Sequence, residues 1–385
     1  MRAPTDDHPP LAVLPKRRVR WRDRRLTRLV LAVLVVLIVI PAASLTSALR
    51  APGTDSVAAR VAEWGRSHGL SGVVDRLERM TYQAPKLGGA LAGGSPLDQP
   101  GLTHAARALP PSGLLPVPAV ALPAVPGEGT WRVVAAVRGR PALQTAYLRP
   151  DMMHTSYTAG IAWMDTSLLH FVLHPGTQEP GRGPWPQAPQ VTAQERPHVV
   201  GAFNGGFRLD AARGGFYEGG RTVGALRAGA ASLVITNDGR AQVGQWGRDL
   251  RMSRSIDAVR QNLDLIVDGG QLVPGLDSNT RHRWGATIGN RLYVWRSGVG
   301  QTASGALVYA AGDRLSAATL AELLRRAGSV RAMELDINSE WTSFVLFPTG
   351  LFRTEPNLLP DMQRKPQRYD TTSSRDFIAV LRTSP

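Results

Sequence analysis

The chain has no cysteine among its 385 residues. This absence excludes a disulfide-stapled fold, a zinc–thiolate site, an iron–sulfur cluster and a cysteine nucleophile. Lysine is scarce as well, because only Lys16, Lys86 and Lys365 accompany the arginines in a total of 45 basic residues. Charged residues make up only 19% of the chain and hydrophobic residues 43%, a balance that excludes a chain disordered throughout.

Common catalytic motifs are also missing. The histidines lack the His-Glu-x-x-His spacing of zinc hydrolases, and no Gly-x-Ser-x-Gly elbow marks a serine hydrolase. We therefore expect no cofactor and no metal site, and leave open a divalent ion held by carboxylates. No nucleic-acid partner is expected, because no recognisable nucleic-acid module accompanies the basic residues.

The N-terminal region predicts a membrane span. Residues 1–28 carry nine basic and three acidic side chains, a net charge of +6, and residues 29–49 form an uncharged, mainly aliphatic run. Roughly 20 apolar residues cross a bilayer as a helix, and a basic flank keeps the N-terminus in the cytoplasm. We expect a single-pass signal-anchor at 29–49 that contacts the lipid bilayer of the cell membrane and places the C-terminal domain outside. A cleaved signal and secretion are the alternative, because Pro41 and the small residues after it resemble a cleavage region.

Three further segments follow the apolar run. Residues 50–83 predict two short helices broken at Gly69, the first capped by Asp55 or Ser56. Residues 84–129 are rich in Pro, Gly and Ala, which predicts an extended spacer. Residues 130–385 have the composition of a globular domain.

The globular region reads as β-rich. Short apolar runs are separated by hairpin turns such as the Asn-Asp-Gly at 237–239. One clear helix follows Ser316 and ends before Gly328, which have the residue types of an N-cap and a C′ position. The predicted class is α+β, with a mixed, mostly antiparallel β-sheet and few helices, preceded by one N-terminal transmembrane helix.

Three apolar strands each end in a polar residue at a turn. These residues are Asn204, which precedes Gly205 and Gly206, and the carboxylates Asp268 and Asp336. Glycine after a polar residue lets backbone approach a ligand and frees N–H groups for an anion. Because polar side chains at strand ends can gather at one rim of a sheet, we expect Asn204, Asp268 and Asp336 to line one pocket.

The ordered set of motifs resembles the phosphodiester glycosidase family, a known member of which removes N-acetylglucosamine from a sugar phosphodiester. The resemblance covers about residues 131–385. The matching parts are the strand with Asn-Gly-Gly-Phe (Ala202–Phe207), Gly219–Arg221, an expected strand at Arg283–Gly289, the helix at Leu315–Leu324, the strand ending in Leu335 and Asp336, and the strand Phe377–Leu381.

The resemblance departs from the family at one loop. The family usually follows Leu-Asp with Gly-Gly-Gly-Ser, whereas this chain continues from Asp336 with Ile-Asn-Ser-Glu. The resulting Glu-Leu-Asp-Ile-Asn variant is similar to that of long, membrane-anchored actinobacterial relatives.

Cleavage of a sugar–phosphate bond needs an acid or base and groups that hold phosphate oxygens. Asp336 is the first candidate for the acid or base, with Glu334 on the same strand and Asp268 as a second carboxylate. A turn cap is the alternative role for Asp336 and Asp268. The candidate substrate-binding residues are Asn204, Gly205, Gly206, Arg221, Arg260, Arg283, Asn338 and Glu340.

The expected function follows from this resemblance. It implies an envelope-facing hydrolase that acts on a sugar-1-phosphodiester in a wall polymer or glycolipid. The alternative is a non-catalytic protein that binds or scaffolds envelope glycans on the same fold. Nothing in the sequence predicts an oligomeric state.

Overall fold

The computed structural model describes residues 21–91, 93, 95–97, 109–287, 291–347 and 356–383. The chain divides into two compact units, Met1–Ala51 and Pro52–Pro385. The first contains helix α1 (Trp21–Leu49), whose part Leu26–Leu49 is long and apolar enough to cross a membrane. The predicted span at 29–49 lies within this helix, which suits an anchor or a signal sequence, and most of the basic segment lies outside the described residues.

The second unit begins with two short helices, α2 (Val57–Ser67) and α3 (Ser71–Thr81). Ser56 caps α2 by accepting a hydrogen bond from the N–H of Ala59 at 3.0 Å. Gly69 lies between the helices with a φ of +77°, a conformation that glycine adopts without strain. The predicted helix pair and its cap are therefore confirmed.

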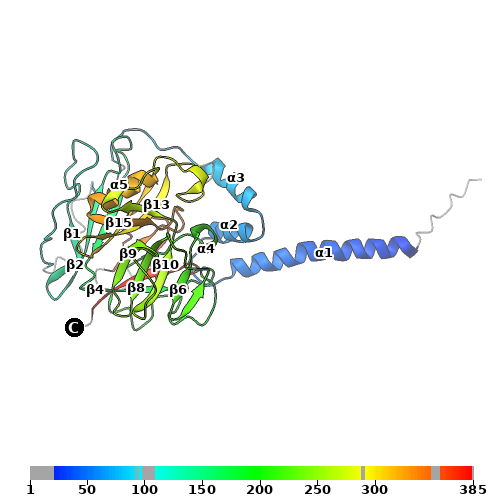
Figure 1. Ribbon diagram of the computed structural model, residues 1–385. Coiled ribbons are helices and arrows are strands. Elements are labelled where there is room, and N and C mark those ends of the chain that lie inside the picture. Colours follow the sequence, from blue (N-terminus) through cyan, green and yellow to red (C-terminus); the bar gives the residue numbers. More distant parts are fainter. Residues whose placement is uncertain are drawn as a thin grey trace, which may run out of the picture. The chain divides into compact units, whose positions relative to one another are not determined.

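Strands of the described residues form three sheets, and the strand pairs within them are antiparallel (Figure 1). The eight-stranded sheet has the order β1 (Arg132–Val137), β2 (Arg140–Leu148), β3 (Ala159–Met164), β14 (Leu307–Leu315), β13 (Val294–Thr302), β15 (Ser329–Glu334), β11 (Leu265–Asp268), β12 (Gln271–Leu272). The five-stranded sheet has the order β7 (Arg221–Val223), β6 (Phe216–Glu218), β10 (Ile256–Gln261), β8 (Ala231–Thr236), β9 (Ala241–Gln245). The four-stranded sheet has the order β16 (Phe344–Leu346), β5 (Val199–Asn204), β17 (Phe377–Arg382), β4 (Leu169–His174).

The remaining described helices are α4 (Leu209–Ala212), α5 (Ala317–Arg326) and the 3₁₀ turns η1 (Thr280–His282) and η3 (Pro366–Tyr369). Ser316 caps α5 by accepting from the N–H of Thr319 at 3.0 Å, as its sequence predicts. The mostly antiparallel sheets and few helices confirm the predicted class.

The eight-stranded sheet is buried on both faces. Because side chains alternate along a strand, Val308 and Ala310 of β14 join a core under α5, whereas Tyr309 joins the main core on the other face. The helix packs against β13, β14 and β15 (Figure 1). On the opposite face, Tyr309 contacts Phe203 of β5 and Phe344 of β16, with ring centroids 5.3 and 5.0 Å away. This packing presses the end of β5 against the eight-stranded sheet.

Two expected segments differ in the structure. Residues 283–287, expected to start a strand, form a loop after η1, and residues 288–290 lie outside the described part. Trp284 fills the core under α5 and donates its Nε1–H to the carbonyl of Gly275 at 2.8 Å, which fixes the loop without strand pairing. Part of the expected spacer packs on the domain, since Val117 is buried and Glu128 forms a buried ion pair with Arg149 at 2.9 Å.

Candidate functional site

The ends of β5 and β15 meet through Ser297 of β13. The side-chain amide of Asn204 donates to Ser297 Oγ at 3.0 Å, and the same Oγ accepts from the N–H of Asp336 at 3.1 Å. Asn204 and Asp336 are each only 3% exposed. The structure thus brings together these two of the three strand-end residues singled out from the sequence.

Asn204 uses its whole hydrogen-bonding capacity within the protein. Its Nδ2 donates to the carbonyl of Gly205 at 2.8 Å as well as to Ser297. Its Oδ1 accepts from the hydroxyl of Tyr309 at 3.0 Å and from the N–H of Ser343 at 3.1 Å. An amide offers two donors and two acceptors, so Asn204 holds the strand ends in place and has no group left for a ligand.

Asp336 is a buried carboxyl group with few partners. Its Oδ1 accepts from the N–H of Asn338 at 3.0 Å, and its Oδ2 lies 3.5 Å from Nη2 of Arg375. Burial raises the pKa of Asp336 to about 6, although the Arg375 guanidinium and the Asn338 N–H favour the ionised form. The carboxyl therefore titrates close to neutral pH, as a general acid must.

Arg375 belongs to a cluster of three buried arginines around one tryptophan. The guanidinium carbons of Arg364, Arg368 and Arg375 lie 4.9, 5.7 and 5.0 Å from the ring centre of Trp341. Each of these arginines is 5% exposed or less, and the buried Nε of each has no hydrogen-bond partner in the described part of the chain. We call these four residues the arginine–tryptophan cluster. Three buried guanidinium groups with unused donors create a positive electrostatic potential that favours an anion.

Helix α2 supplies a carboxylate to this cluster. Glu63 Oε2 accepts from Nη1 of Arg208 at 2.7 Å, and Glu63 Oε1 lies 3.8 Å from Nη1 of Arg375. The residues before α2 add a further contact, because Asp55 pairs with Arg364. The carboxylate of Glu63 therefore lies beside the guanidinium that also faces Asp336, and α2 covers this part of the site.

A buried ion pair packs against the glycine loop after β5. Arg260 Nε donates to Asp376 Oδ2 at 2.8 Å, and each of the two side chains is 1% exposed. A Cβ on Gly205 would lie 2.0 Å from Asp376 Oδ2, and one on Gly206 would lie 3.1 Å from Arg260 Cζ. Only glycine fits at position 205, and a side chain at position 206 would be in tight contact with Arg260. Arg260 thus lies next to the site, with its guanidinium engaged by protein groups.

The other carboxylate predicted on β15, Glu334, is completely buried. It forms an ion pair with Arg296, whose Nε also donates to the carbonyl of Leu315 at 3.0 Å. Burial raises the pKa of Glu334, and the Arg296 guanidinium opposes this shift.

The altered loop after Asp336 packs against the approach to α2. Asn338 Oδ1 accepts from the N–H of Glu340 at 2.9 Å, which closes a local turn. Glu340 Oε2 accepts from the hydroxyl of Ser56 at 3.2 Å and lies 3.7 Å from Nη1 of Arg364. Both residues therefore lie at the edge of the arginine–tryptophan cluster.

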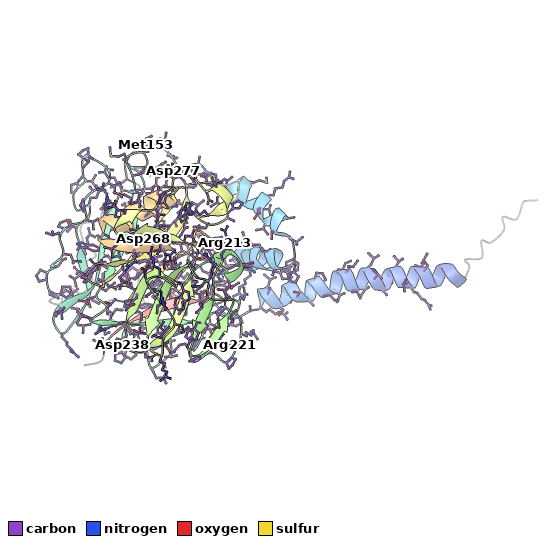
Figure 2. The ribbon with its side chains drawn as sticks, viewed as in Figure 1. Met153, Arg213, Arg221, Asp238, Asp268 and Asp277 are labelled. Atoms are coloured by element: carbon purple, nitrogen blue, oxygen red, sulfur yellow. The ribbon has the colours of Figure 1, made fainter. Side chains whose placement is uncertain are left out.

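Three of the predicted site residues contact other groups of the domain. Asp268 pairs with Arg248 at 2.7 Å, and Figure 2 shows Asp268 and Arg221 well apart on the domain. Arg221 stacks over Trp185 at 4.4 Å. Arg283 is engaged by Asp264 at 3.4 Å.

Strand direction explains why Asp268 does not join Asp336. Strand β11 runs antiparallel to β15, with Val267 opposite Ala332. The last residue of β11 therefore lies beside the beginning of β15, whereas Asp336 follows its end. A common rim for strand ends holds for parallel neighbours, and these neighbours are antiparallel.

The same rule reveals residues that sequence reasoning missed. Strand β17 runs antiparallel to β5, with Phe377 opposite Asn204. The residues just before β17, Arg375 and Asp376, therefore lie beside the glycine turn just after β5. A polar pair before the C-terminal strand was the available signal. Glu63 carried no such signal, because nothing in the sequence of α2 relates it to the sheet.

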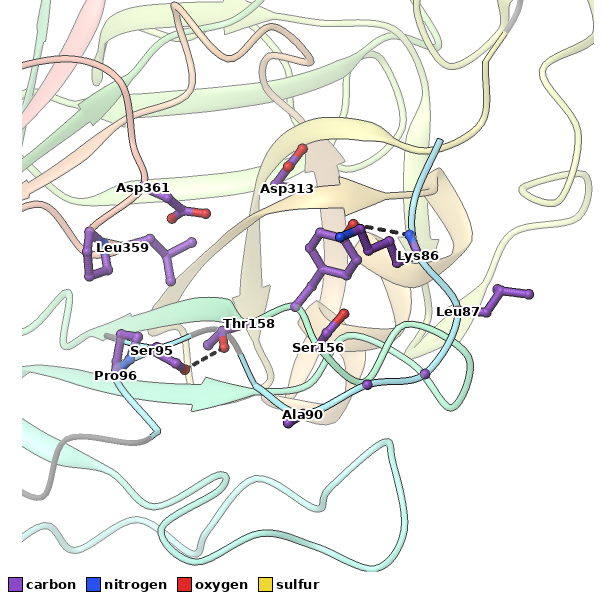
Figure 3. Close-up of a pocket in the computed structure, with 15 residues that line it drawn as sticks. Lys86, Leu87, Ala90, Ser95, Pro96, Ser156, Thr158, Asp313, Leu359 and Asp361 are labelled. Atoms are coloured by element: carbon purple, nitrogen blue, oxygen red, sulfur yellow. Dashed lines mark hydrogen bonds between the residues drawn. The ribbon is translucent and has the colours of Figure 1, made fainter. Parts of the chain in front are cut away.

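No group of three or more His, Asp or Glu side chains suited to a metal ion occurs in the described ranges. A cavity of about 560 Å³ that Asp336 does not line is formed by residues 86–90, 93, 95 and 96, the segment 156–158 before β3, Asp313 of β14, and residues 359–361. Asp313 and Asp361 face this cavity, where Ser95 and Thr158 share a hydrogen bond of 2.7 Å (Figure 3). None of the sequence-predicted site residues lines it.

Comparisons with known proteins bear on the same part of the chain. Residues 197–344 match the phosphodiester glycosidase family, a segment that holds Asn204, Arg260 and Asp336 and excludes Glu63 and Arg375. No curated protein matches the chain.

Two solved structures show more distant similarity. One is the catalytic domain of zebrafish N-acetylglucosamine-1-phosphodiester alpha-N-acetylglucosaminidase, auto-inhibited by its pro-peptide. The sequence identity is 14%, the match covers 66% of this chain and 88% of that chain, and the TM-score is 0.42. The other is a hypothetical protein from Synechocystis, with 13% identity, coverage of 64% and 63%, and a TM-score of 0.38.

Proposed function

We propose that the chain is a membrane-anchored hydrolase that cleaves sugar-1-phosphodiesters on the outer side of the cell membrane. The family match at residues 197–344 supports the reaction class. One structural observation carries the proposal, namely that the buried carboxyl of Asp336 lies 3.5 Å from an arginine of a cationic cluster. The apolar helix α1 supports the anchor.

The proposed chemistry divides the work between the carboxyl and the arginines. The bond between C1 of the sugar and the bridging oxygen breaks, water supplies the new oxygen on C1, and a phosphate monoester leaves. Protonated Asp336 donates its proton to the leaving oxygen, and the attacking water loses its surplus proton to solvent. Arg375 binds the phosphate oxygens and stabilises the negative charge that develops on the leaving oxygen in the transition state. Glu334 is completely buried and paired with Arg296, and it positions the end of β15.

Substrate entry requires a rearrangement at α2. Asp336 is 3% exposed, and Glu63 lies against both Arg208 and Arg375. A phosphodiester carries the same sign of charge as the Glu63 carboxylate, so the two compete for the same guanidinium groups. Release of Glu63 from Arg375 is therefore the first step in the proposed cycle.

Glycan binding without turnover is the second candidate function. The observation that favours it is the closure of the site, because Trp341 is 5% exposed and lies against Arg375. If Trp341 stays in place, a sugar can bind only at the edge of the cluster, where Glu340 offers a hydrogen-bond acceptor.

The experiment is an assay of product release from a panel of sugar-1-phosphodiesters with the full chain in detergent. We expect turnover by the unaltered protein and a loss of about 100-fold in Asp336→Asn, the usual effect of removing a general acid. Asp277→Asn is the matched control, because Asp277 is exposed at the surface (Figure 2). Equal turnover by Asp336→Asn with an unchanged fold would contradict the assigned role. Saturable glycan binding with no product would select the second candidate.

A further inference from the structure

Helix α3 leaves one apolar face exposed. Leu70, just before the helix, and Val73, Leu77 and Met80 are 43%, 57%, 61% and 77% exposed. Their spacing of three, four and three residues places them on one face. We call these four residues the α3 stripe. Single exposed apolar side chains are ordinary, whereas a contiguous row on one short helix marks a contact surface.

The neighbouring helix does not cover the stripe. Helix α2 touches α3 through Val74, since a Cβ on Gly65 would lie 3.1 Å from Val74 Cγ2. Val57 and Val61 of α2 are themselves 68% and 42% exposed. The helix pair therefore presents apolar side chains from both helices to its surroundings.

The length of the chain between α1 and α2 indicates the partner. Seven residues, 50–56, separate Leu49 from Val57. Even when fully extended they span at most about 25 Å. If α1 crosses the bilayer, the start of α2 is held within this distance of the membrane surface, and only residues 68–70 separate α2 from α3. Residues 50–83 carry five arginines and four acidic residues, so the attraction is hydrophobic rather than electrostatic.

We propose that the α3 stripe inserts into the outer lipid–water interface of the membrane that α1 spans. This inference rests on the proposed membrane anchor. An amphipathic helix of this kind lies in the plane of the interface, with its apolar face at the boundary of headgroups and acyl chains. Because α2 carries Glu63, the docked helix pair holds the arginine–tryptophan cluster near the membrane surface. A sugar phosphate linked to a lipid is presented at that surface.

Fluorescence quenching of the full chain in phosphatidylcholine nanodiscs tests the proposal. The chain has no cysteine, so Leu77→Cys gives one labelling site for an environment-sensitive fluorophore. Asp75→Cys is the matched control on the opposite side of the same helix. We expect a nitroxide at the lipid headgroup to quench the probe at position 77 at least threefold more than the probe at position 75, and aqueous iodide to show the reverse order.

Two outcomes would overturn the proposal. Equal quenching of both probes by iodide would place the stripe in water. Protection of position 77 from both iodide and lipid nitroxide would mean that protein covers it, as in contact with a second copy of the chain. A probe at Leu37→Cys in α1 distinguishes failure of the membrane anchor from failure of the α3 docking. If a mid-bilayer nitroxide quenches position 37 while position 77 stays in water, the anchor stands and only the docking of α3 fails. If position 37 is not quenched, the anchor itself fails.

Discussion

At the scale of single residues, the chemistry depends on how burial acts on Asp336. Its ordinary pKa is 3.8, and burial raises the pKa to about 6 in the folded protein. Between these two values the folded protein holds a proton that the unfolded chain releases. The free energy of unfolding therefore falls as pH rises from about 4 to about 6, and the contribution of Asp336 is lost above that window.

This pH dependence gives the first prediction. Asp336→Asn cannot titrate, so its unfolding free energy should change less between pH 4 and pH 6 than that of the unaltered protein. A shift of about two pKa units corresponds to a difference on the order of 3 kcal/mol. Denaturant unfolding at several pH values measures it. Parallel pH curves for the two proteins would show that Asp336 has an ordinary pKa and is not the buried acid.

Sequence reasoning identified Asp336 and Asn204 because each ends an apolar strand, a local pattern. It did not identify Arg375, since the only local signal is a polar pair before the C-terminal strand, which does not stand out among 45 basic residues. The position of Arg375 depends on which strand pairs with β5 and in which direction. The placement of Asp268 away from Asp336 has the same cause.

At the scale of secondary-structure elements, α2 covers part of the candidate site through Glu63. Its N-cap and the glycine break after it could be read from the sequence, because capping is local chemistry. Its docking against Arg375 and Arg208 could not, because those contacts join residues more than 140 positions apart. The strand expected from Arg283 was wrong in residues 283–287 for a related reason. The burial of Trp284 in the core under α5 replaced the pairing that a short apolar run suggests.

The second prediction concerns Glu63 on α2. Glu63→Gln removes the charge that lies against Arg208 and Arg375 and keeps the shape of the side chain. We expect kcat/KM for a sugar-1-phosphodiester to rise roughly fivefold, because an ion pair of this exposure contributes about 1 kcal/mol. Glu322→Gln on α5 is the control, since Glu322 forms helix ion pairs with Arg325 and Arg326 away from the site. A fall in kcat/KM would mean that Glu63 takes part in the reaction rather than blocking it.

At the scale of the whole molecule, the class of fold followed from composition and from the spacing of turns. Three antiparallel sheets, with α5 packed on the largest of them, agree with that expectation. The order of strands did not follow, because neighbours such as β13 and β15 are separated by β14 and α5 in the chain. Long-range pairing of this kind leaves no local pattern.

The third prediction concerns the position of the domain relative to the membrane. A basic flank before α1 should keep the N-terminus in the cytoplasm and the domain outside. Protease added to intact cells should then remove the domain and leave a small membrane-embedded fragment. A domain that resists protease until the cells are lysed would reverse the orientation. A mature protein that starts near Leu49 would establish a cleaved signal in place of an anchor.

The central claim is that the chain cleaves the bond between the sugar carbon and the bridging oxygen of a phosphodiester. Hydrolysis in water labelled with oxygen-18, followed by mass spectrometry of both products, tests this claim directly. The proposed reaction places the label on C1 of the released sugar and leaves the phosphate monoester unlabelled. Label in the phosphate would show attack at phosphorus and would contradict a glycosidase, and no labelled product from any member of the panel would contradict hydrolysis itself.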